Sequence, residues 1–268
     1  LQGKYLFTAQ TQVYGEYAHE REYEDDTQDV TITIKGTNDR PTITGDTGHV
    51  TEDGTPQPQM ASGTITFGDI DLQDVNTLTV TSADGLNTTK SIVENTTPVT
   101  ERMDVLGKYG ALTLNENGQW TYTLDNSKVQ TLSQGEQVKE TFAVSYSDTH
   151  GGLATNNIVI TITGTNDTPS ISGKDVGTVQ EDLTLSATGQ LTATDVDHDA
   201  GATWSVQGND HSSYGTFTVN QSGQWTYTLA NSTNAVQSLA EGQHITETYT
   251  VKVADSHGAF DTQDVTIT

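Results

Sequence analysis

Short runs that alternate apolar and polar residues recur along the whole chain. Hydrophobic residues occupy every second position at 30–34 and at 158–162, so one face of each predicted strand is buried. Residues 111–124 predict a hairpin, because an Asn-Gly pair supplies the positive φ that a tight turn needs. Trp120 and its counterpart Trp225 are predicted core residues. No stretch of ten residues has the spacing of an amphipathic helix, so the pattern predicts an all-β fold of antiparallel β-sandwiches.

The chain contains internal repeats. Residues 36–45 recur at 164–173, and residues 117–124 recur at 222–229. Self-similarity of this kind predicts tandem structural units, each formed from the same set of strands.

The repeats divide the chain into three predicted parts. Residues 1–35 resemble the closing strands of a preceding, partial repeat. Residues 36–163 form the first sandwich, here called unit one, and residues 164–268 form the second, unit two. Unit one carries an insertion near 84–105 that unit two lacks, and its polar composition predicts a surface loop.

Composition narrows the classes of partner. The chain has 11 basic and 36 acidic residues, a formal net charge of −25, which repels nucleic acid and anionic membrane surfaces. No apolar run approaches the roughly 18 residues of a membrane-spanning helix. The absence of cysteine excludes disulfides and cysteine-ligated zinc. We therefore expect no nucleic-acid partner and no membrane insertion.

A subset of the carboxylates follows the strand pattern. The run 42–50 rises about 30 Å at about 3.3 Å per residue, the length of a sandwich domain, and carries the chain to the far end of unit one. Glu52 is therefore predicted beside the next linker, while the return run 63–67 brings Asp69 back to the starting end. Each junction should collect acidic residues from both neighbours and from the linker. At the second junction these are Glu52, Asp53, Asn166, Asp167, Asp195, Asp197 and Asp255.

So many carboxylates within a few ångströms repel one another and raise one another's pKa unless a cation lies among them. Calcium fits best, because it takes about 6 to 8 oxygen ligands, whereas zinc favours nitrogen and sulfur. The other interpretation of the same residues is a set of solvated turn aspartates that binds no cation.

A group of short motifs carries a resemblance to a known family. They are Gly-Thr-Asn-Asp-x-Pro, Val-x-Glu-Asp, Thr-Ala-Thr-Asp195-Val-Asp197, Gly-Gln-Trp-Thr-Tyr-Thr-Leu and Val-Thr-Ile-Thr. Over residues 24–268 the chain resembles the VCBS repeats of large bacterial RTX-type surface adhesins, and more widely it is similar to cadherin-like domains. The resemblance implies an Ig-like sandwich fold with calcium ligands at the unit ends.

Carried over by position, with two aspartates added from the recurring Glu-Asp pairs, the predicted calcium ligands are Asn38, Asp39, Glu52, Asp53, Asp69, Asp71, Asp148, Asn166, Asp167, Glu181, Asp182, Asp195, Asp197 and Asp255. The chain departs from the cadherin pattern at one position. Gly36 and Gly164 stand where the first linker aspartate would be, so one ligand per linker is missing.

A hydrolase is not expected. Ser147, Asp148 and His150 are close in sequence, and unit two has Asp255, Ser256 and His257 in the matching turn. A nucleophile, its base and the residue that orients the base usually come from distant elements, whereas these residues crowd one repeated turn. The repetition indicates a structural role.

The favoured function is that of structural extender repeats in a secreted bacterial surface adhesin, stiffened by Ca²⁺ at the junctions. The expected partners are neighbouring repeats of the same chain, with a cell-surface or biofilm ligand bound through other domains. One alternative is a glycan- or peptide-binding adhesion module that uses the 84–105 insertion. Another is a covalently cross-linked, pilin-like domain.

Overall fold

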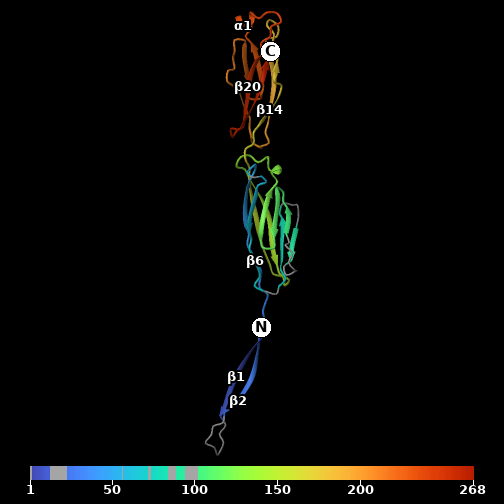
Figure 1. Cartoon of the computed structure of the whole chain (residues 1–268), viewed down its shortest axis with the longest axis vertical. Helices are drawn as coiled ribbons and strands as arrows, with labels where there is room; N and C mark the ends of the chain where they lie inside the picture. The colour runs from blue at the N-terminus through green and yellow to red at the C-terminus, as the bar shows by residue number, and fades with distance from the viewer. Residues whose placement is uncertain (1, 13–22, 56, 72–73, 84–88, 94–101) are drawn as a thin grey trace, which may run out of the picture.

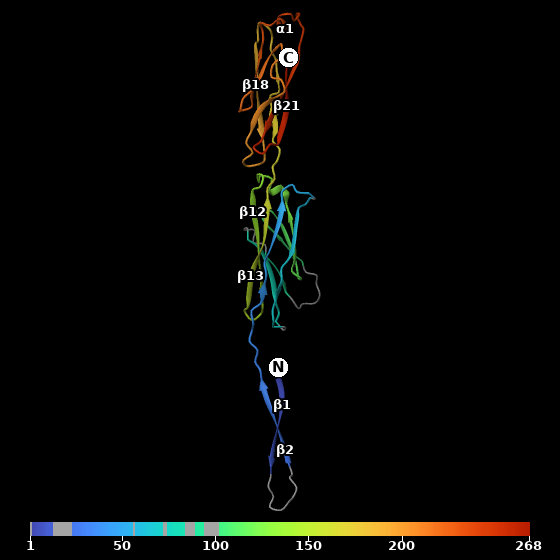
Figure 2. The same ribbon diagram turned by 90° about the vertical axis from the view of Figure 1, so that its left-hand side faces the viewer.

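The computed structural model is an elongated rod in which two β-sandwiches are stacked end to end (Figures 1 and 2). A β-hairpin extends from the end of unit one that lies away from unit two. The hairpin, unit one and unit two therefore follow one another along the long axis in the order of the sequence. The structure describes residues 2–12, 23–55, 57–71, 74–83, 89–93 and 102–268. Side chains are described from residue 30 onward, outside 84–101.

Unit one contains two main sheets that enclose its core. Their strand orders are β5-β11-β10-β9 and β4-β13-β12-β7-β8, and β3 pairs separately with β6. The elements are β3 (Thr42–Ile43), β4 (Asp46–Thr51), β5 (Met60–Thr64), β6 (Phe67–Gly68), β7 (Thr77–Ser82), β8 (Thr89–Val93), β9 (Arg102–Leu106), β10 (Gly110–Asn115), β11 (Gln119–Leu124), the 3₁₀ turn η1 (Asn126–Lys128), β12 (Gln137–Ser147) and β13 (Leu153–Thr163).

The β10–β11 hairpin shows how the sequence sets this fold. Leu114 pairs with Trp120 across a turn in which Gly118 has a φ of 77°, as the Asn-Gly pair predicts. A Cβ on Gly118 would also collide with the carbonyl oxygen of Ile65, so the close approach of this turn to the backbone of Ile65 requires glycine. Trp120 and the two alternate residues after it are buried, which confirms the predicted core face.

Unit two is a smaller sandwich with its own core. Its sheets have the orders β14-β16-β19-β18 and β15-β21-β20-β17, and Trp225 is fully buried between them. The elements are β14 (Ser170–Gly173), β15 (Val176–Gly177), β16 (Ser186–Thr194), β17 (Thr203–Gln207), β18 (Gly215–Val219), β19 (Gln224–Leu229), the helical turn α1 (Asn234–Gln237), β20 (Glu247–Ala254) and β21 (Phe260–Ile267). Each sandwich thus buries a separate hydrophobic cluster.

The predicted single run 42–50 is wrong in detail. The chain first forms β3, which pairs with β6. It then forms β4, which runs parallel to β13 in the five-stranded sheet. The crossing lies at Gly45, where an added Cβ would lie 2.5 Å from the carbonyl oxygen of Asn157. In unit two β15 runs parallel to β21 in the same way, so neither sandwich is purely antiparallel. Residues 42–51 still carry the chain from one end of unit one to the other.

The prediction that the insertion is a loop is wrong for its described parts. Strand β8 pairs with β7, and β9 pairs with β10, so the insertion adds an edge strand to each sheet. Met103 and Val105 are buried in the core. These two side chains make the insertion part of unit one's packing. Residues 84–88 and 94–101, including the Asn-Thr-Thr-Pro stretch, lie outside the described residues.

The predicted burial of the alternating row in the tail is also wrong. Strands β1 (Gln2–Gln12) and β2 (Tyr23–Thr33) form a two-stranded antiparallel hairpin. Val30 and Ile32 are 41% and 47% exposed, whereas the matching Ile158 and Ile160 of unit one are fully buried. The reason is architectural: the hairpin has no second sheet packed on it among the described residues, so it has no interior.

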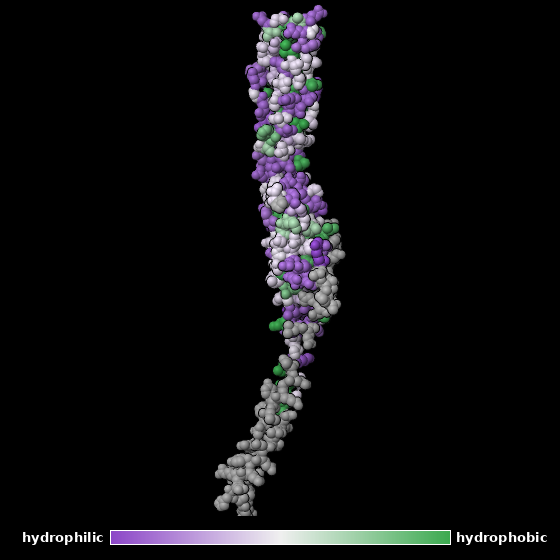
Figure 3. Space-filling view, in the orientation of Figure 1, coloured by the Kyte–Doolittle hydropathy of each residue, from purple (hydrophilic) through white to green (hydrophobic). Residues whose placement is uncertain are grey.

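Outside the residues drawn in grey, the face of the two sandwiches that Figure 3 shows is largely hydrophilic, with apolar residues scattered singly. Scattered apolar residues of this kind are normal on a folded surface. Within the described residues, no helix has the length and apolar character needed to cross a membrane.

Candidate metal centres at the ends of the units

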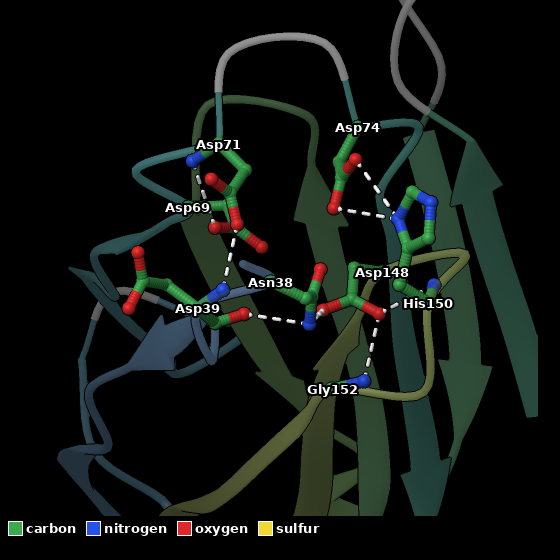
Figure 4. A network of polar contacts seen from close by, with 8 residues as sticks. All are labelled: Asn38, Asp39, Asp69, Asp71, Asp74, Asp148, His150 and Gly152. Carbon is green, nitrogen blue, oxygen red and sulfur yellow. Dashed lines mark hydrogen bonds and ion pairs between the residues drawn. The ribbon is translucent and has the colours of Figure 1, made fainter. Parts of the chain in front are cut away.

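The linker before unit one and two nearby loops form a polar cluster (Figure 4). The backbone amide of Asp39 donates to Asp71 Oδ2 (2.7 Å), and the amide of Asp71 donates to Asp69 Oδ1 (3.1 Å). Asn38 Nδ2 donates to Asp148 Oδ2 (3.2 Å), which lies in the turn between β12 and β13. The structure therefore brings together all five residues predicted for this end of unit one.

The second junction repeats the same three contacts. The amide of Asp167 donates to Asp197 Oδ2 (2.9 Å), and the amide of Asp197 donates to Asp195 Oδ1 (3.0 Å). Asn166 Nδ2 donates to Asp255 Oδ2 (2.8 Å). Because the same motif forms the same hydrogen bonds in both places, this scaffold is encoded locally within each linker and unit.

Asp148 and Asp255 each close the turn between the last two strands of their unit. Asp148 Oδ1 accepts from the backbone amide of His150, and Asp255 Oδ1 from that of His257, both at 2.8 Å. Burial acts to raise the pKa of both carboxyls, but hydrogen bonds from the linker asparagine and from backbone amides outweigh it and lower the pKa. Both side chains are therefore held as carboxylates at neutral pH.

Unit one contributes a buried glutamate to the second junction. Glu52 has no exposed surface, and its carboxylate accepts from the linker amide of Thr165 (3.1 Å) and from Gln130 Nε2 (3.0 Å). Asp53 follows it with a φ of 49°. Asn126 accepts from the amide of Asp53 (2.9 Å) and donates to its carboxylate (2.5 Å). The far end of unit one thus faces the linker with two fixed carboxyl groups.

The acidic groups of the two units interact across this junction. Burial raises the pKa of Glu52 from 4.5 to about 7, a linker amide partly opposes the shift, and the charges of Asp167, Asp53 and Asp197 add to it. Burial and the charges of Asp53, Asp197 and Asp195 likewise raise the pKa of Asp167. The arrangement therefore concentrates negative charge that a cation would stabilise.

Several side-chain oxygens in the described clusters are buried and have no hydrogen-bond partner. They are Asp69 Oδ2 at the first end and Asn166 Oδ1, Asp167 Oδ2, Asp195 Oδ2 and Asp197 Oδ1 at the second junction. Burying such oxygens without a donor costs free energy. Carboxylate and amide oxygens are the ligands that calcium takes in proteins, so the donor set at both ends fits a calcium ion.

The first end contains one carboxylate that the sequence interpretation missed. This carboxylate belongs to Asp74. One carboxylate oxygen from each of Asp69, Asp74 and Asp148 lies within 4.8 Å of the other two. Asp74 also contacts His150 Nδ1 at 3.0 Å, and this hydrogen bond and the charge of Asp74 raise the pKa of His150. Three residues after the Asp-x-Asp motif, unit two has Ala200 where unit one has Asp74. Comparing the repeats therefore gave no signal for this residue.

Glu181 and Asp182 lie at the far end of unit two. Asp182 repeats the geometry of Asp53, with a φ of 58° and reciprocal hydrogen bonds to Asn231 of 3.1 and 2.9 Å. Among the described residues the structure does not bring this pair together with the other predicted ligands, which lie at the other end of unit two and in unit one.

The repeated Ser-Asp-His turn is arranged for structure. Asp148 accepts from the backbone amide of His150, while the imidazole of His150 contacts Asp74. In unit two Ser256 Oγ lies 3.3 Å from Nδ1 of the adjacent His257, and the aspartate again accepts from backbone amides of the turn. These contacts give the recurring motif a structural role in closing the turn.

Comparison with known families decides where the chain belongs. The model of the bacterial cadherin-like domain matches residues 38–164 and 166–268. The chain belongs to this family. The two matches coincide with the two sandwiches, so the resemblance seen in the motifs is confirmed, and we refer to both as cadherin-like units.

Among solved structures, the chain is similar to mouse cadherin-23 EC22-24, with 18% identity, a TM-score of 0.46, and coverage of 86% of this chain and 66% of that one. For protocadherin gamma C5 EC1-3 the identity is 12% and the TM-score 0.44, with 98% and 76% coverage.

Two curated proteins share a short segment with the chain. They are the esterases EstA of Pseudomonas aeruginosa and Pseudomonas putida, each 68% identical over 34 residues. The match covers 13% of this chain and 5% of either esterase, which is too short to indicate esterase activity.

Proposed function

We propose that the two cadherin-like units are structural extender repeats of a secreted bacterial surface adhesin, and that calcium bound at the junctions stiffens the chain. The observation that carries the proposal is the second junction. There, acidic residues of both units and of the linker converge, and four buried oxygens lack a hydrogen-bond donor. When bound, the ion would supply positive charge and a common partner for oxygens of both units.

The proposed ligands fall into three sets, one for each unit end described above. They are Asn38, Asp39, Asp69, Asp71, Asp74 and Asp148 at the first end, Glu52, Asp53, Asn166, Asp167, Asp195, Asp197 and Asp255 at the second junction, and Glu181 and Asp182 at the far end of unit two. The second set is the one that joins two complete units. Its occupancy would decide whether they move as one body.

Calcium should change the order between the units more than the fold within them. Each unit has its own hydrophobic core, so neither needs the ion in order to stay folded. Without the ion, the like charges at the junction repel and favour bent arrangements. The proposed role therefore concerns stiffness along the rod, in a chain whose partners are the neighbouring repeats and whose target is bound through other domains.

Small-angle scattering with calcium and with chelator tests this function. We expect a defined rod in calcium and a broader set of bent shapes in chelator, while far-ultraviolet circular dichroism stays unchanged. Calorimetry should show calcium binding at about 10⁻⁴ to 10⁻³ M, the range of extracellular modules. Scattering curves that are identical in calcium and chelator, with no calcium-dependent heat, would contradict the proposal.

The ligand-binding alternative rests on the insertion, which unit two lacks. The described parts of the insertion complete the two sheets and the core, which favours a packing role. Deleting all of it would remove buried Met103 and Val105, so the test replaces only 94–101 with a Gly-Ser segment of equal length. Loss of binding to a glycan or peptide panel would support the alternative, and an unchanged or absent response would favour the extender.

A further inference from the structure

The glycine that replaces the first linker aspartate at the second junction is tightly packed. The Gly164 amide donates to the carbonyl of Glu136 (2.8 Å), and the Gly164 carbonyl accepts from the amide of Gly135 (3.0 Å). A Cβ on Gly164 would lie 2.6 Å from both the Cβ of Leu132 and the carbonyl oxygen of Ser133. Its φ lies outside the left-handed region, so glycine is required here for lack of space.

The matching glycine of the first linker has a different environment. A Cβ built on Gly36 would have nothing within 4 Å. The two glycines lie in the same Gly-Thr-Asn-Asp motif, so the motif alone does not cause the close packing. It arises at Gly164 because its backbone extends the β12–β13 ladder by one residue beyond the Gln137–Thr163 pair, which brings it against the turn 133–136 of unit one.

The same turn also reaches unit two. His198 Nδ1 lies 3.2 Å from Glu136 Oε2, and the amide of Asp199 donates to Ser133 Oγ (3.4 Å). The Ser133 amide donates to Glu136 Oε2 (3.1 Å), which fixes that carboxylate within the turn. None of these four residues belongs to the proposed calcium ligands, so none of the contacts uses an ion as a partner.

The corresponding turn of unit two lacks the groups that make these contacts. Ala240 and Gln243 stand in place of the serine and the glutamate, and the Ala240 amide donates to Gln243 Oε1 (3.2 Å) as its counterpart does in unit one. The backbone of the turn is thus shared, but the hydroxyl and the carboxylate are specific to unit one.

We propose that the turn 133–136 is a cation-independent docking surface for the start of the following unit. The partner that it fits is a repeat with glycine at the first linker position and His-Asp after its Asp-x-Asp motif, as in unit two. The inference deepens the proposed extender role, on which it rests. It adds that the linker stays attached to unit one when calcium is removed, which limits how far the units bend.

Hydrogen exchange of single amides, measured by NMR in chelator, tests whether the start of the linker stays attached to unit one. The amides of Gly164 and Gly135 should exchange at least about tenfold more slowly than that of exposed Gly36, because each is held in a backbone hydrogen bond. Exchange of Gly164 at the rate of Gly36 in chelator would overturn the proposal. This readout needs no variant and no bound ion.

A matched pair of variants, Gly164→Ala and Gly36→Ala, provides the second test. Spin labels on one introduced cysteine per unit report the distance between the units, and the chain has no cysteine of its own. In chelator, Gly164→Ala should broaden the distance distribution beyond that of the parent, whereas Gly36→Ala should leave it unchanged. Equal distributions for Gly164→Ala and the parent would refute the docking surface.

The two proposals fail in different ways. If calcium does not bind and does not narrow the distribution of distances between the units, the extender proposal fails, whatever the glycine variants show. If calcium narrows the distances in the parent but Gly164→Ala has no effect in chelator, only the docking surface fails.

Discussion

The two cadherin-like units have the same hydrogen-bonded scaffold where their linkers enter, yet the scaffolds have different surroundings. At the first end, the three clustered carboxylates of Asp69, Asp74 and Asp148 all come from unit one. At the second junction, the neighbouring unit adds Glu52 and Asp53, and burial together with nearby negative charges raises the pKa of Glu52. The comparison teaches that the scaffold is local, whereas the coupling between units comes from the neighbour.

Unfolding one unit should give the largest difference between the two units. Trp120 is buried and donates from Nε1 to Asp46 Oδ2 (3.0 Å), so Trp120→Ala should destabilise unit one by about 3–5 kcal/mol. Unit two should stay folded, because its core is separate. The remaining tryptophans, Trp204 and Trp225, both belong to unit two, so fluorescence follows it alone while limited proteolysis follows unit one.

The matched variant Trp225→Ala should show the reverse pattern. If Trp120→Ala lowers the stability of both units equally, the cores are coupled, and the description of two independent sandwiches is incorrect.

Removing carboxylates from one end tests whether the two clusters are separate sites. Asp195→Asn with Asp197→Asn retains hydrogen-bond acceptors for the backbone amides of residues 167 and 197 but removes two charges. We expect calcium affinity at the second junction to fall by at least about tenfold, since affinity depends on ligand charge. The matched pair Asp69→Asn with Asp71→Asn should weaken only the first end. If either pair of substitutions removes calcium binding at both ends in calorimetry, the two clusters are not separate sites.

The raised pKa of Glu52 predicts how stability depends on pH in chelator. Because its pKa is about 7 in the folded protein and 4.5 ordinarily, the folded state binds the proton more tightly. This contribution to stability is full below about pH 4.5, declines as pH rises and is lost above about pH 7. Thermal unfolding in chelator at pH 5 and pH 8 should therefore show a smaller decline for Glu52→Gln than for the parent. Equal declines would exclude Glu52 as the cause.

Replacing Asp74, which unit two lacks, should change calcium binding the least. Asp74→Asn should weaken calcium binding at the first end by a few-fold, because one charge is lost from a cluster with several carboxylates. The second junction should be unaffected, since Ala200 occupies the matching position. Terbium luminescence in the Asp195→Asn, Asp197→Asn background isolates the first end, and an unchanged titration there would remove Asp74 from the ligand set.

Local repetition explains which parts of the site the sequence predicts. The linker asparagine, the Asp-x-Asp loop and the turn aspartate recur, and the structure gives each copy the same hydrogen bonds. Glu52 is placed beside the linker because the rise per residue in a strand is nearly constant, so chain length fixes which end it reaches. The sequence predicts this placement even though the run changes sheets at Gly45.

Features without a repeat or a periodic signal were missed. Asp74 has no counterpart in unit two, and its position depends on how the loop folds back toward Asp148. Met103 and Val105 lie in an insertion whose polar composition concealed two core positions. The exposed row at Val30 and Ile32 shows the limit of periodicity, because an alternating strand is buried only where a second sheet covers it.

Crystals grown in calcium test whether one ion connects the two units. We expect anomalous density at the second junction, surrounded only by oxygen atoms, with ligands from Glu52 of unit one, from the linker and from Asp195 or Asp197 of unit two. Such an ion would connect the two units through shared ligands. The account is contradicted if crystals grown at millimolar calcium show no ion there, or show one that is bound by residues of a single unit.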